Sequence, residues 1–79
     1  MRTGWHATET MAAWTVEEVT SFLQSKDLVG PAAYMGDNGV DGQDLLSLTF
    51  ETLTSDLRCT PFAARKVLCA RDQYLQQAS

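Results

Sequence analysis

Signals for the start of a helix recur so closely along this chain that every helix except the last must be short. They stand at Thr15, Gly30-Pro31, Asp41, Thr49 and Thr60-Pro61. Isolated helices of fewer than about 12 residues are marginal in water, because nucleation is costly. The helices must therefore share one core and unfold as one unit.

The first of these helices has the strongest start signal. Thr15 and Glu18 fit a capping box, in which each side chain accepts a hydrogen bond from the backbone of the other. Apolar residues then repeat at helical spacing through Leu23, which predicts a helix over about 16–25.

Three short helices are expected to follow. Pro31 suits the first helical position, because the N–H group that it lacks would have no partner there. Asn38-Gly39 ends that helix, and Asp41 and Thr49 are expected to cap the next two.

Pro61 opens the longest helix, over about 61–77. Its apolar face is supplied by Val67, Leu68, Tyr74 and Leu75. No segment alternates as a strand would. The expected fold class is all-α: a compact five-helix bundle with a long C-terminal helix.

The chain has 79 residues, enough for one domain with one modest core. Residues 1–12 show no sustained periodicity, so we expect a flexible N-terminal leader, a domain over 13–77 and a tail at 78–79.

Composition restricts the partners. The net charge is −4, and an acidic chain repels a phosphate backbone unless its basic residues cluster, so nucleic acid is not the first expectation. No apolar run reaches the roughly 18 residues needed to cross a membrane, and the N-terminus lacks the apolar region of a secretory signal. An intracellular protein is expected, in the cytoplasm or the nucleus.

The sequence offers no catalytic or metal-binding pattern. Cys59 and Cys69 do not have metal-ligand spacing, and the one histidine, His6, lies far away. A calcium loop beginning at Asp37 would have Gly39 and Leu48 where oxygen ligands are required. We expect no enzyme, cofactor, metal or small-molecule substrate, with Cys59 serving as a small core residue.

The order of these motifs resembles the sterile alpha motif (SAM) domain family over roughly residues 13–77. The most specific part is the run N-G-V-D-G-Q-D-L-L-S-L-T over residues 38–49, which is similar to the family's N-x-[I/V]-D-G-x-x-L-L-x-L-T. Gly42 in this run is expected to allow close packing. The expected core residues are Trp14, Val19, Phe22, Leu23, Leu45, Leu46, Leu53, Leu57 and Leu68.

The chain departs from the family at the start of the last helix. Many members have Gly-His-Arg or a similar triplet there, whereas this chain has Phe62-Ala63-Ala64 followed by Arg65 and Lys66. This end of the helix is where many members dock a partner, so the identity of the partner is left open.

Charge is divided along the chain. Residues 29–57 carry five acidic and no basic side chains, whereas residues 58–71 carry four basic and no acidic ones. Exposed acidic and basic side chains that fall in separate segments by chance, with no partner to bind, would give the same division.

The resemblance gives these two blocks a meaning, because SAM domains commonly associate head to tail, the mid-loop surface of one against the end-helix surface of the next. The matching mid-loop residues are Asp37, Asn38, Val40, Asp41, Asp44, Glu51 and Asp56. The matching end-helix residues are Arg58, Thr60, Pro61, Phe62, Arg65 and Lys66. Val40, Leu45 and Phe62 could supply a hydrophobic centre if they are exposed.

The resemblance therefore implies a protein-interaction module of a scaffold, adaptor or regulatory protein, whose partner is itself or another SAM domain. The alternative is binding of RNA hairpins, as in Smaug-type SAM domains, through Arg58, Arg65, Lys66 and Arg71. The net charge and the missing Gly-His-Arg argue against that alternative.

Overall fold

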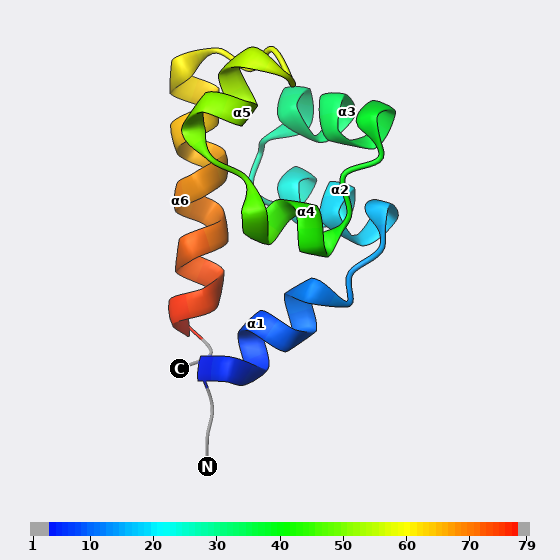
Figure 1. Ribbon diagram of the computed structural model, residues 1–79, viewed down its shortest axis with the longest axis vertical. Helices are drawn as coiled ribbons and strands as arrows, with labels where there is room; N and C mark the ends of the chain where they lie inside the picture. Colours follow the sequence, from blue (N-terminus) through cyan, green and yellow to red (C-terminus); the bar gives the residue numbers. More distant parts are fainter. Residues whose placement is uncertain (1–3, 78–79) are drawn as a thin grey trace.

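Six helices run through residues 4–77, which are the residues that the computed structural model describes. They are α1 (Gly4–Ala12), α2 (Val16–Ser25), α3 (Val29–Asn38), α4 (Gly42–Ser47), α5 (Phe50–Ser55) and α6 (Pro61–Gln77). Figure 1 shows α2 to α5 gathered beside the long α6, with α1 crossing the end of the molecule where α6 finishes. The all-α class and the long C-terminal helix are confirmed, and the five predicted helices correspond to α2–α6.

Local caps start the helices at the residues that the sequence indicated. The Glu18 backbone N–H donates to Thr15 Oγ1 (3.2 Å), and the Thr15 N–H donates to Glu18 Oε1 (2.9 Å). A second capping box, which we did not predict, joins Asp41 and Asp44 at the start of α4. These boxes satisfy N–H groups that a helix start otherwise leaves without partners.

The start of α3 differs from the expectation. The helix begins at Val29, so Pro31 is its third residue and not its first. Any position in the first turn tolerates proline, because none of those N–H groups has an intrahelical acceptor. The helix ends as expected at Gly39, whose φ of 70° places it in the left-handed region that glycine adopts readily.

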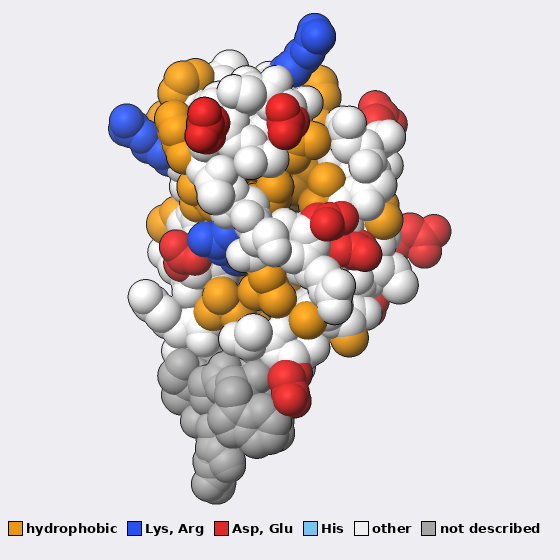
Figure 2. All heavy atoms as spheres, viewed as in Figure 1, with side chains coloured by type: hydrophobic (Ala, Val, Ile, Leu, Met, Phe, Trp, Pro, Cys, Tyr) orange, Lys and Arg blue, Asp and Glu red, His pale blue; other side chains and the backbone are white. Residues whose placement is uncertain are grey.

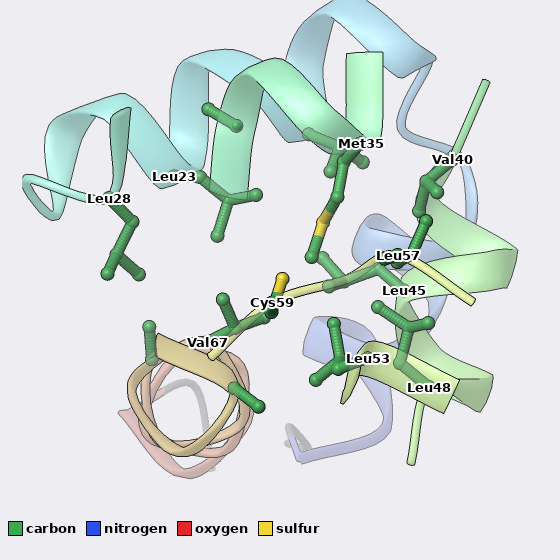
Figure 3. Close-up of a cluster of buried hydrophobic side chains, with 14 of the residues drawn as sticks. Leu23, Leu28, Met35, Val40, Leu45, Leu48, Leu53, Leu57, Cys59 and Val67 are labelled. Atoms are coloured by element: carbon green, nitrogen blue, oxygen red, sulfur yellow. The ribbon is translucent and has the colours of Figure 1, made fainter. Parts of the chain in front are cut away.

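The core lies between the short helices and α6 (Figure 3). Its buried residues are Met11, Val19, Leu23, Leu28, Ala32, Met35, Val40, Leu45, Leu48, Leu53, Leu57, Cys59, Ala64, Val67 and Ala70. Five of the nine predicted core residues are therefore buried.

The other four predicted core residues, Trp14, Phe22, Leu46 and Leu68, are only partly buried and pack against the core from its edge. Trp14 and Phe22 stack with Tyr74, with ring centroids 5.0–5.7 Å apart. Leu68 lies beside the buried stripe of α6, which follows the three-residue spacing of Ala64, Val67 and Ala70.

The expected leader is corrected for residues 4–12, which form α1 and contact α4 and α6. Met11 is fully buried, and the Gly42 N–H donates to the Trp14 carbonyl (2.9 Å). A Cβ atom on Gly42 would overlap the Met11 carbonyl, so the predicted close packing at Gly42 is confirmed and its partner is the end of α1. Residues 1–3 and the expected tail at 78–79 lie outside the described residues.

Candidate interaction surfaces

The end of α3, α4 and α5 together form a groove of about 420 Å³. Four of the seven predicted mid-loop residues line it: Asn38, Val40, Asp44 and Asp56. The remaining lining residues are Ser47, Leu48, Thr52 and Leu57. Figure 2 shows the corresponding hollow, with hydrophobic side chains at its floor and acidic side chains around it.

The groove is acidic. Asp44 and Asp56 are both exposed, and neither lysine nor arginine is among its lining residues. The other three predicted acids, Asp37, Asp41 and Glu51, do not line it. The site therefore has two carboxylates beside an apolar floor.

Residues in and beside the groove also maintain the fold. Asp41 Oδ1 accepts from the Asp44 N–H (3.0 Å), and Asp44 Oδ2 accepts from the Asp41 N–H (3.4 Å). Val40 is buried and contributes only an edge to the groove floor, and Leu45 is completely buried. The suggestion that Leu45 belongs to an exposed hydrophobic centre is therefore wrong.

The predicted end-helix residues lie together before and within the first turns of α6. All six are exposed: Arg58, Thr60, Pro61, Phe62, Arg65 and Lys66. Thr60 caps the helix by accepting a hydrogen bond from the Ala63 N–H (3.1 Å). Phe62 is the most prominent, with 70% of its surface exposed.

A cation and an aromatic ring form a pair on this surface. Lys66 Nζ lies 4.8 Å from the centroid of the Phe62 ring, within the distance of a cation–π interaction. The positive end of the α6 dipole is at the same place, so backbone and side chains both make this surface attractive to anions.

Arg58 adopts an unusual backbone conformation, with φ of 58°. The left-handed region costs a residue with a side chain roughly 1–2 kcal/mol. The turn is held from within, because the Cys59 N–H donates to the Leu53 carbonyl (2.9 Å) and Cys59 is buried. Burial also raises the pKa of the Cys59 thiol.

Arg71 does not belong to the end-helix surface, although the sequence places it in the basic block. Its Nη1 donates to the carbonyls of Leu48 (2.8 Å) and Leu45 (3.3 Å), and its Nε pairs with Asp72 (3.0 Å). Arg71 therefore caps the C-terminal end of α4 across 23 residues of sequence, which no local pattern indicates.

A second, smaller hollow of about 220 Å³ lies on α6 and was not predicted. It is lined by Lys26, Leu28, Lys66, Cys69, Ala70 and Gln73. Among the described residues, no three histidine, cysteine or acidic side chains are grouped to hold a metal ion. No helix within the described range is long and apolar enough to cross a membrane.

No family model matches this chain. It is 31% identical over 71 residues to WD repeat, SAM and U-box domain-containing protein 1 of Danio rerio. That match covers 90% of this chain but only 15% of the relative's length.

Two solved structures share the fold. One is a hetero SAM domain structure of Ph and Scm (TM-score 0.74, 25% identity, covering 78% of this chain and 96% of that chain). The other is a heterodimer of Scm-SAM and Sfmbt-SAM (TM-score 0.76, 22% identity, covering 87% and 91%).

The helical architecture and these likenesses define a small, all-α helical-bundle domain. The chain has the fold of a SAM domain, as its motifs suggested.

Proposed function

We propose that this domain is a non-catalytic association module that joins SAM domains head to tail. The acidic groove of one domain receives the basic end-helix surface of the next, whether that neighbour is a second copy or a different SAM domain. Such a module would belong to a scaffold, adaptor or regulatory protein.

The observation that carries the proposal is the charge complementarity of two surfaces that share no residue. The groove has Asp44 and Asp56 and no cationic lining residue, while the end-helix surface has Arg58, Arg65 and Lys66. No end-helix residue lines the groove, so the groove is left open to the end-helix surface of another molecule.

The contact is heterologous, and this determines the form of the assembly. Each molecule that uses its groove still offers its end-helix surface, so association continues into open chains unless one surface is blocked. Opposite charges accelerate the encounter and fix its orientation more than they set the affinity.

A protein partner is favoured over RNA by the position of Arg71. Its guanidinium is committed to the α4 carbonyls, which reduces the exposed basic cluster to three side chains. The SAM–SAM heterodimers among the structural neighbours support the same choice.

Sedimentation velocity over a concentration series, at low and at high salt, tests the proposal. We expect a weight-average mass that rises with concentration and falls as salt screens the charges. A monomer at every concentration would exclude association between copies, and mixtures with other SAM domains would then test the heterotypic form.

A further inference from the structure

Phe62 is an apolar side chain that the fold leaves outside its core. It is 70% exposed on the first turn of α6, more than any other large hydrophobic residue among those whose burial the structure describes (8–76). The core closes without it, through Ala64 and Val67 on the same helix. Aromatic side chains are enriched at the buried centres of protein interfaces, whereas lysine is depleted there, so the ring and not the ammonium group is the candidate anchor.

The acidic groove offers the Phe62 side chain apolar surroundings that it does not have in its own molecule. The accessible edges of the buried residues Val40, Leu48 and Leu57 give it an apolar floor, with Asp44 and Asp56 beside them. Its volume of about 420 Å³ is within the range of about 300–1,000 Å³ that encloses small molecules. One aromatic ring and the end of a lysine side chain therefore fit within it.

We infer that Phe62 of a second copy of this chain enters the groove as the anchor of the contact, with Lys66 beside it. The ring covers the apolar floor, and the Lys66 ammonium group, already held over the ring, meets the carboxylates of Asp44 and Asp56. This inference rests on the proposed head-to-tail association and names the side chain on which its specificity depends.

The pairing explains why the departure from the family lies at residues 62–64. A glycine at the start of this helix would present backbone to a partner, whereas Phe62 presents a ring that needs a cavity. Only a neighbour with an open apolar floor between carboxylates accepts it, and this chain has such a floor. Specificity gained in this way comes from the clash with other partners as well as from the fit.

Variants of both sides of the contact test the inference, with association measured by sedimentation and folding by thermal melting. Phe62→Ala should weaken self-association about 30-fold, as expected for a buried aromatic anchor, and Phe62→Leu should weaken it less. Both should melt as the wild type does, because an exposed residue contributes little to stability.

Ser47→Trp fills the groove, since Ser47 is an exposed lining residue at the end of α4. It should abolish self-association, whereas Gln43→Trp on the same helix, outside the groove, should not. If Ser47→Trp fails to fold, the two Phe62 variants decide alone.

The outcomes separate the anchor from the proposed function. Phe62→Ala with wild-type affinity, while charge reversal at Lys66 still prevents assembly, would overturn the anchor and leave head-to-tail association standing. If Gln43→Trp and Ser47→Trp weaken self-association equally, the groove is not the site that receives Phe62. A wild-type chain that remains monomeric at every concentration would overturn the inference together with association between copies.

Discussion

The groove and the end-helix surface differ in how much they also support the fold. Several residues that line the groove have structural tasks: Asp44 pairs with Asp41 in the capping box of α4, and Leu48 and Leu57 belong to the core. The end-helix surface consists of exposed side chains, of which only Thr60 makes a hydrogen bond that starts a helix. Substitutions at these residues of the groove will therefore change folding and binding together, whereas most substitutions at the end-helix surface will change binding alone.

The reason is the position of α4, which is held at both ends by distant residues. Gly42 rests against the end of α1, and Arg71 of α6 binds the carbonyls at the other end. A six-residue helix cannot hold its shape alone, so the groove depends on these contacts.

The largest effect is expected at Gly42. In Gly42→Ala the new methyl group overlaps the Met11 carbonyl, and backbone must move to admit it. We expect a loss of roughly 1–3 kcal/mol in the free energy of unfolding, or more, because overpacking forces shifts in a filled core. Chemical denaturation would measure it, and Gly30→Ala is the matched control, since a Cβ there meets nothing within 4 Å. Equal stability of the two variants would show that α1 does not press on α4.

The next largest loss of stability is expected when Arg71 is replaced. Arg71→Met keeps much of the side-chain volume but leaves the α4 carbonyls without their donor, which costs about 1–3 kcal/mol for buried polar groups. Thermal melting should show the loss, with Lys66→Met as a control that removes a charge from the same helix without removing a cap. If both variants melt together, Arg71 is a surface charge, as the sequence suggested.

A smaller effect should distinguish two acids of the mid-loop set. Asp41→Ala removes an N-cap and should cost roughly 0.5–2 kcal/mol. Asp56→Ala should cost no more than about 0.5 kcal/mol, because Asp56 is exposed and ends α5, where a negative charge opposes the helix dipole. Denaturant midpoints would compare them, and a larger loss for Asp56 would reverse this assignment.

The smallest change in stability is expected at Arg58, with the opposite sign. Arg58→Gly relieves a left-handed conformation that costs about 1–2 kcal/mol, and the freedom of glycine in the unfolded chain offsets about 0.5–1 kcal/mol of that gain. The variant should be slightly more stable and yet associate more weakly, because it loses a cation of the end-helix surface. A less stable variant would show that the Arg58 side chain supports the fold.

The sequence predicted the elements whose signals are local. Thr15, Asp41, Thr49 and Thr60 each place a side-chain acceptor at a helix start, and each caps a helix in the structure. The acidic groove was anticipated in part, since charge can be counted along a chain.

What the sequence did not predict depends on contacts between distant residues. The helix α1 has little periodicity and is fixed through Met11, which meets Gly42 far along the chain. Leu45 was expected in the core and also, if exposed, in a hydrophobic centre of the interaction surface, and only tertiary packing, which buries it completely, decides between the two. Arg71 was counted as a surface charge because the carbonyl groups that it binds are on α4, 23 residues or more away in the sequence.

The central claim is that the groove and the end-helix surface are two halves of one contact, and a mixing experiment tests it most directly. Asp56→Lys breaks the groove side and Lys66→Glu breaks the end-helix side; Asp56 closes α5 through its backbone N–H, which the substitution keeps, and Lys66 lies within α6. Glu9→Lys, on the exposed side of α1, makes the same charge change away from both surfaces and should assemble as the wild type does. Each of the first two variants alone should sediment as a monomer, and an equimolar mixture should form a heterodimer that grows no further, because the broken halves cap both ends. A mixture that stays monomeric while the wild type assembles would contradict the account.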